Sequence, residues 1–378
     1  MKLLFIGPIP PPVSGFSLAT QCILNHLTTS FPAKKSSIYF INRSNSRSLI
    51  RILLHFLHSI KAAVTLSPDS VYLALSGNLG ILTDFLLLLP HLILKKQIYI
   101  HHHSFSYLNR TSIPLKFLMP FLSKCSVHHI ILCDRMKELL ICRYPCSSHH
   151  QFFLLSNIAI IPLPGKPSDT SETSVKSRTI SVNYSSNNPS ENPLNIGLLS
   201  NLTSTKGLFT FLEIAHSFID SPHVFHLAGP IDDSEREQSL LLINNAPNVV
   251  YHGPLYHVQK SEFLSLLNVF LFPSTYANEA EPLVIHEAMS YGCFVIANCM
   301  GCIQQITSPY LLKSMNILDF NALSIKAITN ISCMQLQHIN ELRDTILLDF
   351  QLRRHLSMNK VDKLCELLMD TSKTHQIN

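Results

Sequence analysis

The sequence predicts an α/β protein with two doubly wound, Rossmann-like domains that face each other across a cleft. Two observations predict this fold. Short apolar and β-branched runs alternate with helix-like segments, which is typical of buried parallel strands joined by helices. A stretch rich in serine and proline then divides these runs into two sets. The chain of 378 residues is also longer than one ordinary domain core requires.

The expected strands define the domain boundaries. The first set lies at residues 3–7, 38–42, 71–75, 98–102, 128–133 and 152–156, and the second at 195–200, 224–229, 249–253, 269–274 and 294–298. We therefore expect an N-terminal domain at 1–165, a linker at 166–192, a C-terminal domain at 193–345, and a helical segment at 346–378 that packs back on the N-terminal domain. Ligands of such sheets bind beyond the carboxyl ends of the strands, which would face the cleft.

Composition and charge narrow the class of protein. Hydrophobic residues make up 46% of the chain and charged residues 14%, which excludes a disordered or coiled-coil protein. Residues 1–165 carry fifteen Lys and Arg against four Asp and Glu, a net +11, whereas the remainder carries fourteen against twenty, a net −6. The basic half suggests an anionic partner, either a membrane surface or a phosphorylated lipid, and a solvated basic face is the alternative. No nucleic-acid-binding motif accompanies the charge, so we expect no nucleic acid partner.

A helix-like segment at residues 43–61 is the candidate for a membrane contact. Arg43, Arg47 and Arg51 recur every fourth residue beside leucine and isoleucine side chains. Such a basic amphipathic helix can lie on an anionic membrane. The alternative is a helix of the folded domain with one solvent-exposed polar stripe. The N-terminus reaches its prolines before a signal sequence could form. We therefore expect a cytoplasmic protein, peripheral on the inner face of the membrane.

The stretch NEAEPLVIHEAMSYG concentrates three glutamates in a chain that is poor in acidic residues. Pro282 suits the first turn of a helix, so the free amides near Leu283 and Val284 predict an anion site. Glu279 precedes this helix and Glu287 lies inside it. A carboxylate there can accept hydrogen bonds from a ribose diol, each contributing about 1.5–3 kcal/mol. Together these groups fit a nucleotide sugar, and a pair of solvated glutamates is the alternative.

Loops that follow other expected strands add candidates. Lys206 lies at a helix start and can neutralise a diphosphate, although a surface charge is the simpler reading of a lone lysine. Gly15 follows a proline-rich loop at another helix start, where glycine permits close approach of a ligand. The histidine triplet 101–103 ends a strand, where side chains reach the crevice, and a structural role for any one of them is the alternative.

These candidate residues resemble the motifs of a known protein family. The spacing Glu279-x7-Glu287 within PSTYANEAEPLVIHEAMSYGCFVIA resembles the donor-site signature of glycosyltransferase family 4, retaining enzymes of the GT-B fold. The resemblance extends over residues 1–165 and 193–310. It implies that Glu279 contacts the transferred sugar, that Glu287 holds the ribose and that Lys206 binds the donor phosphates.

The resemblance also implies roles for the N-terminal half. Gly15 would meet the donor phosphate, and His103 would touch the sugar, with His101 as the next choice. Two departures from the family are visible. Ser200-Asn201 stands where an arginine is common, and residues 301–305 read GCIQQ where a Gly-Gly turn and a glutamate are usual.

The implied function is transfer of a hexosyl-type sugar from a nucleotide-diphosphate sugar to a glycan or lipid-linked acceptor, in surface polysaccharide or lipopolysaccharide synthesis. No metal and no cofactor beyond the sugar donor are expected, because the cysteine pairs at Cys142/Cys146 and Cys299/Cys302 have no second pair at zinc-ribbon spacing. Two alternatives stay open: a nucleotide-sugar epimerase of the same fold, and a non-catalytic protein that binds sugars or membranes.

Overall fold

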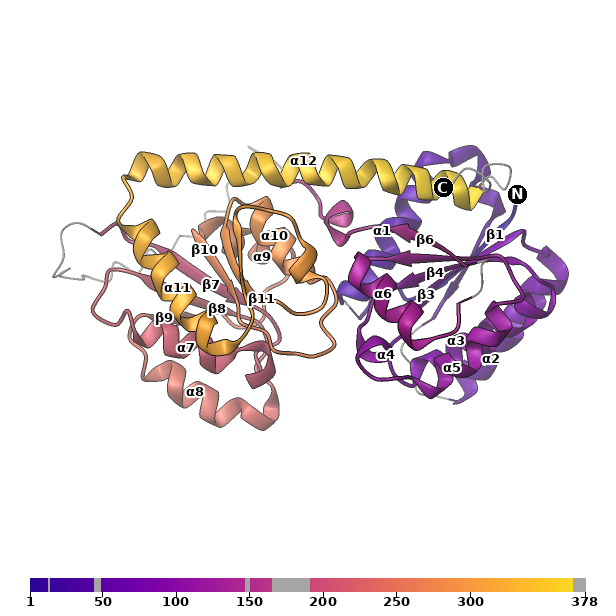
Figure 1. The fold of residues 1–378 in the computed structure, drawn as a ribbon, viewed down its shortest axis with the longest axis horizontal. Helices are drawn as coiled ribbons and strands as arrows, with labels where there is room; N and C mark the ends of the chain where they lie inside the picture. The colour runs from indigo at the N-terminus through magenta and orange to yellow at the C-terminus, as the bar shows by residue number, and fades with distance from the viewer. Residues whose placement is uncertain (13, 44–48, 147–149, 165–190, 370–378) are drawn as a thin grey trace. The chain divides into compact units, whose positions relative to one another are not determined.

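The computed structural model describes residues 1–12, 14–43, 49–146, 150–164 and 191–369. By its contacts the chain divides into two compact units (Figure 1). Unit 1 comprises Met1–Ile160, Ala277–Leu283 and Arg353–Asn378, and unit 2 comprises Ile161–Tyr276 and Val284–Leu352. Nearly all of the expected linker at 166–192 lies outside the described residues.

The described part of unit 1 contains a six-stranded sheet in the order β2-β1-β3-β4-β5-β6, paired in parallel throughout. Its inner strands are buried along their whole length, which explains their continuous apolar sequences. The strands are β1 (Leu3–Gly7), β2 (Ile38–Asn42), β3 (Ser70–Leu75), β4 (Gln97–His102), β5 (Val127–Ile131) and β6 (His150–Leu154).

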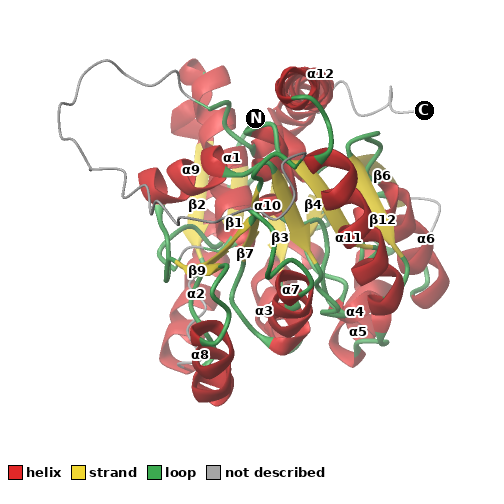
Figure 2. Cartoon of the chain, turned by 90° about the vertical axis from the view of Figure 1, so that its left-hand side faces the viewer, coloured by secondary structure: helices red, strands yellow, loops and turns green. Residues whose placement is uncertain are grey.

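Helices connect these strands and lie on both faces of the sheet, as the red helices around the yellow strands show (Figure 2). They are α1 (Gly15–Ser30), α2 (Leu49–Lys61), α3 (Gly80–Ile93), α4 (Ser106–Asn109), α5 (Ile113–Leu122) and α6 (Asp134–Arg143). Helix α1 begins with a capping box, because the Ser14 and Ser17 hydroxyls each accept a hydrogen bond from the other residue's backbone N–H. This cap fixes the turn that follows the proline loop.

The described part of unit 2 contains a second parallel sheet of six strands, in the order β12-β11-β10-β7-β8-β9. The strands are β7 (Asn195–Leu199), β8 (Val224–Ala228), β9 (Val249–Tyr251), β10 (Val269–Phe272), β11 (Phe294–Asn298) and β12 (Leu311–Ser314). The connecting helices are α7 (Leu208–His216), α8 (Arg236–Asn244), α9 (His257–Leu266), α10 (Leu283–Ser290) and α11 (Ile317–Ser332). The predicted α/β class with two doubly wound, Rossmann-like sheets is confirmed.

The last helix, α12 (Leu336–Met369), begins ten residues before the helical segment expected from residue 346. From Arg353 onward its residues belong to unit 1, where Leu364 and Leu368 join the core around Leu3 and Phe5. A hydrogen bond of 2.7 Å between Asp362 Oδ1 and the His26 imidazole holds the helix to α1. The C-terminal helix therefore completes the core of the N-terminal sheet.

Candidate functional site

The sheet of unit 2 reverses its strand order between β7 and β10, where doubly wound sheets bind their ligands. The loops that follow these two strands are fastened to each other. The backbone N–H of Thr275 donates to the carbonyl oxygen of Thr205 at 2.8 Å, and the Thr203 hydroxyl accepts from the N–H of Lys206 at 3.1 Å. The two loops therefore form one surface at the switch point.

Lys206 lies on this surface, with its Nζ 4.7 Å from the centre of the Tyr276 ring. A cation that rests on an aromatic face is held in place by its attraction to the π-electrons of the ring. Gly207 follows with a φ of +86°, and a Cβ at this position would lie 2.8 Å from the backbone carbon of Pro273. Only glycine fits there, which explains why the lysine is followed by glycine.

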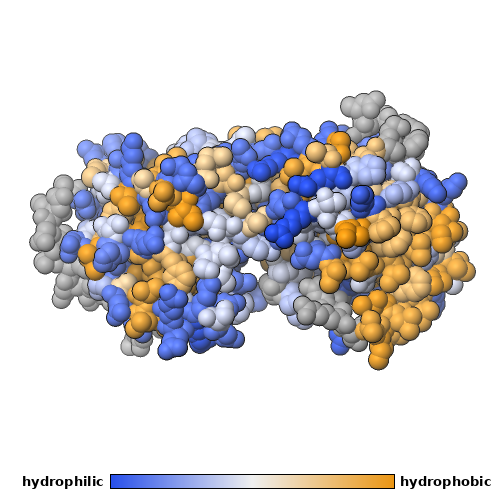
Figure 3. Space-filling model, turned by 60° about the horizontal axis from the view of Figure 1, so that its bottom comes forward, coloured by the Kyte–Doolittle hydropathy of each residue, from blue (hydrophilic) through white to orange (hydrophobic). Residues whose placement is uncertain are grey.

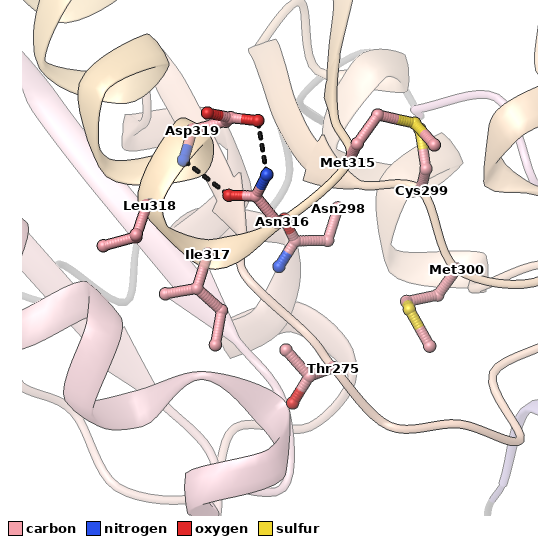
Figure 4. Close-up of a pocket in the computed structure, with 9 residues that line it drawn as sticks. All are labelled: Thr275, Asn298, Cys299, Met300, Met315, Asn316, Ile317, Leu318 and Asp319. Atoms are coloured by element: carbon pink, nitrogen blue, oxygen red, sulfur yellow. Dashed lines mark hydrogen bonds between the residues drawn. The ribbon is translucent and has the colours of Figure 1, made fainter.

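A pocket of about 470 Å³ opens in unit 2 beyond the carboxyl ends of β11 and β12 (Figure 4). Thr275 of the switch-point loop lines one side of it, and Met300 and Met315 give it polarisable apolar walls. The amide side chain of Asn316 caps α11 by accepting from the N–H of Asp319 at 2.9 Å. The pocket thus combines apolar walls with a few fixed polar groups, as small-molecule sites do.

Glu287, the predicted ribose ligand, lies on α10 and makes an ion pair with Lys260 on α9. The Nζ of Lys260 is 2.6 Å from both carboxylate oxygens. The two residues line a pocket of about 260 Å³ together with Tyr291 and the stretch Ile161–Pro164. Sequence reasoning missed Lys260, because a lysine in the first turn of a helix gives no sign of its partner.

The segment Ala277–Leu283 belongs to unit 1 by its contacts, although the sequence placed it in the C-terminal domain. Glu281, which the motif left unexplained, fixes it there. Its carboxylate accepts a hydrogen bond of 2.5 Å from the Ser156 hydroxyl and one of 2.7 Å from the N–H of Asn157. The Asn157 side chain also donates to the carbonyl oxygen of Glu281 at 2.8 Å. Glu281 is therefore an anchor, and it is only 5% exposed.

The half-buried Glu279 lies in this same segment, whose first residues also bind unit 1 through the side-chain amide of Asn109. That amide donates to the carbonyl oxygen of Ala277. Glu279 is thus held from both sides, by Asn109 before it and by Glu281 after it. A carboxylate on a doubly anchored loop is preorganised, which a sugar-positioning group requires.

Gly15 lies beside Leu283 of this segment, and His103 contacts the residue that follows Gly15. A Cβ added to Gly15 would be 3.6 Å from Cδ1 of Leu283, and the ring of the next residue, Phe16, is 5.0 Å from the His103 ring. Among the described residues, no hydrogen-bond partner reaches Nε2 of His103. Burial lowers the pKa of this imidazole, so it is neutral near pH 7. The buried, unpartnered nitrogen fits a ligand hydroxyl.

The other two histidines of the triplet have structural partners. The His101 Nδ1 is 2.6 Å from the Tyr72 hydroxyl on the neighbouring strand. His102 points to the opposite face of β4, where its Nδ1 is 3.0 Å from the Tyr107 hydroxyl and its Nε2 is 2.9 Å from Nδ1 of His129. His102 is therefore a core residue. Nε2 of His101 also has no hydrogen-bond partner among the described residues, so the choice of His103 with His101 next stays a prediction.

The predicted site residues divide between the units. Gly15, His103, Glu279 and Leu283 belong to unit 1, whereas Lys206, Val284 and Glu287 belong to unit 2. Tyr276 and Lys260 are additional site residues.

The basic stripe predicted at residues 43–61 needs a correction. Arg43 lies before α2, is only 5% exposed, and its Nη1 is 3.0 Å from Oδ1 of the fully buried Asp84. Arg47 lies outside the described residues. Of the two described arginines, Arg51 is the one exposed to solvent. Arg43 is buried against Asp84, so it does not share an exposed stripe with Arg51.

Residues 183–329 match the family model described as glycosyl transferases group 1. This stretch of the C-terminal half is therefore similar to group 1 glycosyl transferases. The matched residues include Lys206, Glu279 and Glu287, and they span the switch point of unit 2. No curated protein sequence matches the chain.

Solved structures resemble the chain over nearly its whole length. HepE of Anabaena, in complex with UDP and glucose, has a TM-score of 0.67 at 14% identity and covers 98% of this chain and 99% of its own. A glycosyltransferase of Rickettsia africae has a TM-score of 0.63 at 15% identity, covering 98% of each chain. The lipopolysaccharide outer core galactosyltransferase WaaB has a TM-score of 0.59 at 17% identity, covering 96% and 99%. The group 1 domain thus belongs to a chain with the GT-B fold.

The exchange Gly15→Ala separates fold from ligand binding. The added methyl group meets Leu283 at an ordinary van der Waals distance, so the free energy of unfolding should change by less than about 0.5 kcal/mol. If a donor phosphate approaches the backbone here, affinity for a nucleoside diphosphate should fall about tenfold. Calorimetric titration and thermal unfolding measure the two effects. Asn25→Ala, at an exposed site on the same helix, is the control, and equal affinity of both variants would remove Gly15 from the site.

Proposed function

We propose that this protein is a retaining glycosyltransferase of family 4. It would transfer a hexosyl-type sugar from a nucleotide-diphosphate sugar to a glycan or lipid-linked acceptor in surface polysaccharide synthesis. The observation that carries the proposal is Lys206, which two joined loops and Tyr276 hold at the switch point of the group 1 domain. HepE, which is similar in fold, was solved with UDP-glucose, and WaaB is named as a galactosyltransferase of the lipopolysaccharide outer core.

Donor binding follows from the charges of the candidate site. Lys206 supplies a cation for the diphosphate, and the first amides of α10, at Leu283 and Val284, supply donors for its oxygens. Glu287 binds the ribose diol while it stays paired with Lys260, since each carboxylate oxygen has a second lone pair. Lys206 and the helix amides offset part of the charge of the leaving diphosphate, and the proposed reaction uses no metal and no further cofactor.

Transfer with retention takes place on one face of the sugar. The bond between the anomeric carbon and the diphosphate oxygen breaks, and the acceptor oxygen bonds to the same face as its proton passes to the leaving phosphate. Glu279 positions the sugar and stabilises the positive charge that develops at the anomeric carbon. His103 contacts the sugar as a neutral imidazole, because burial lowers its pKa, and so it adds no positive charge beside the reacting carbon. We place the reaction in the cytoplasm, at the inner face of the membrane.

Two substitutions test these roles. Glu279→Gln removes the charge and keeps the shape, so nucleotide release in the presence of acceptor should fall about 100-fold while donor affinity changes little. Glu287→Ala removes the ribose acceptor, so affinity for the free nucleotide should fall at least about tenfold. Glu237→Gln, on the exposed face of α8, is the control for the loss of one carboxylate. A panel of nucleotide sugars, ranked by the rise in melting temperature that each produces, selects the donor for the assay.

The alternatives give different results in the same assay. An epimerase converts the donor without an acceptor, whereas a non-catalytic binder shows donor affinity without nucleotide release. If the wild type binds no nucleotide sugar, both catalytic readings fail. If Glu287→Ala and Lys260→Met lower the melting temperature equally and leave nucleotide affinity unchanged, their ion pair is structural and the ribose assignment is wrong.

A further inference from the structure

Three neighbouring helices of unit 1 expose an unusual amount of apolar side chain. Helix α3 packs against both α2 and α5, so the three form one continuous layer. Figure 3 shows the hydrophobic side chains gathered over this part of unit 1. We call it the three-helix surface, and its members are Leu49, Ile50, Leu53, Leu57 and Val64 on α2 and the turn after it, Leu82, Leu86 and Ile93 on α3, and Ile113, Phe117 and Phe121 on α5.

These side chains are far more exposed than apolar side chains at the edge of a protein core. Leu49 is 81% exposed, Ile93 71% and Phe117 68%, one on each helix. A single exposed leucine needs no explanation, but a contiguous apolar surface on a soluble domain marks an interaction site. The three-helix surface is contiguous, because α3 packs against α2 on one side and against α5 on the other.

The charges around this surface are of one sign. In the described parts of α2, α3 and α5 the one acidic side chain is Asp84, which is buried against Arg43 and does not reach the surface. Arg51, Lys61 and Lys116 are exposed on the same helices. An apolar face with a basic border and no exposed carboxylate is complementary to an anionic lipid leaflet.

A pocket lies beside the apolar face, between β2 and α2, with a volume of about 540 Å³. Its lining combines apolar side chains such as Leu54 and Phe40 with four cationic or titratable side chains of α2, Arg51, His55, His58 and Lys61. The same helix thus turns apolar side chains one way and cationic or titratable side chains the other. This division suits a helix at the boundary between acyl chains and phosphate head groups.

Helix α2 and its continuation, Leu49–Leu66, are long and apolar enough to cross a membrane, and 17% of this window is buried. A helix at the centre of a soluble core would be mostly buried. Its packing nevertheless holds it to unit 1. The buried Ser59 hydroxyl donates to the carbonyl oxygen of Leu87 at 2.6 Å and is 3.1 Å from the His91 imidazole. Helix α2 is therefore fixed to α3 and can lie along a membrane without crossing it.

We propose that unit 1 docks on an anionic bilayer through the three-helix surface, with the leucine, isoleucine and phenylalanine side chains among the acyl chains. A protein partner fits less well, because the surface lacks the tyrosine and tryptophan anchors common at protein interfaces, and the chain has no tryptophan at all. This extends the membrane contact from residues 43–61 to three helices and replaces Arg43 by Arg51, Lys61 and Lys116. Only its purpose, to meet a lipid-linked acceptor, rests on the proposed function.

Vesicle flotation tests the docking surface with the full chain. Wild type should bind vesicles of phosphatidylcholine mixed with phosphatidylglycerol, and bind pure phosphatidylcholine about tenfold less well. The variant Ile50→Glu/Ile93→Glu/Phe117→Glu places one carboxylate on each helix and should lose at least about tenfold in affinity for the mixed vesicles. The control is Leu241→Glu/Val258→Glu/Leu352→Glu, the same exchange at three exposed apolar positions of unit 2, which should bind like wild type.

Three results would overturn the proposal. Wild type could fail to bind the anionic vesicles, both triple variants could lose binding equally, or wild type could sediment as a dimer that the unit 1 variant dissociates. Donor affinity, measured by thermal shift on the same variants, separates this question from the enzymatic one. A unit 1 variant that binds donor but not vesicles supports docking, and vesicle binding by a chain without donor affinity supports docking while removing the proposed function.

Discussion

Unit 1 is expected to lose most of its stability when the pH falls from about 7.5 to about 5.5. The histidines buried in its sheet and helices include these five: His91, His101, His102, His128 and His129. Burial is the largest cause that lowers each pKa, to about 3 for His102 and about 4 for His91 and His128. For His101 and His129 the neighbouring imidazoles lower the pKa further.

The direction of the effect follows from proton binding. An unfolded histidine has a pKa near 6.5 and takes up a proton as the pH falls through that value, whereas the folded, buried histidine stays neutral. The unfolded state therefore binds more protons, so stability is present above about pH 6.5 and is lost below it. Each histidine contributes about 1 kcal/mol over this range, and five together approach the total stability of an ordinary domain.

Urea unfolding across this pH range measures the slope, which counts the protons taken up on unfolding. His91→Gln, which removes one buried titrating group, should reduce the slope by about one proton. Asn25→Gln, at an exposed position of unit 1, removes no titrating group and should leave the slope unchanged. A free energy of unfolding that stays level or rises on acidification would show that the buried imidazoles do not control stability.

Arg43→Met should destabilise unit 1 by about 3–5 kcal/mol. The exchange leaves the fully buried carboxylate of Asp84 without its cation, and the remaining bond from the N–H of Ser76, 2.7 Å long, does not neutralise the charge. Burial already raises the pKa of Asp84 against the opposing effect of Arg43, so the variant should take up a proton at this carboxyl. Thermal unfolding measures the loss of stability. Hydrogen exchange of the backbone amides in β2 and α3 shows where the loss occurs.

Two further variants isolate the ion pair. Arg51→Met removes the same side chain from an exposed site and should change stability by less than about 0.5 kcal/mol. The double variant Arg43→Met/Asp84→Leu removes both charges and should recover much of the loss, because no unpaired charge remains. If Arg43→Met is no less stable than Arg51→Met, the pair contributes nothing.

The strands were predictable because their burial is recorded in their sequences. Continuous apolar runs mark strands that are covered on both faces, and the structure has a strand at each expected place. The sequence did not predict β12, whose sequence LLKS has one buried leucine and carries Lys313. An edge strand of four residues with a lysine resembles a loop, because only one of its sides has a partner strand.

The candidate site was less accessible to sequence reasoning, because its geometry depends on long-range partners. The motif placed Glu287 in a helix but did not reveal Lys260, 27 positions earlier, on its carboxylate. The same motif presented three glutamates alike, although Glu281 is an anchor bound 124 and 125 positions away. Spacing along the chain identifies which residues share an element, and only the tertiary contacts distinguish a ligand-binding carboxylate from a buried structural one.

The anchor at Glu281 limits how proteins of this kind can exchange their halves. Unit 1 includes the segments Ala277–Leu283 and Arg353–Asn378, so the sequence that belongs to it is scattered over three places. A gene crossover in the linker would combine a foreign Ser156 and Asn157 with a resident Glu281 and leave a buried carboxylate without matched donors. New N-terminal halves should therefore arise by gradual substitution around this anchor more readily than by recombination of whole domains.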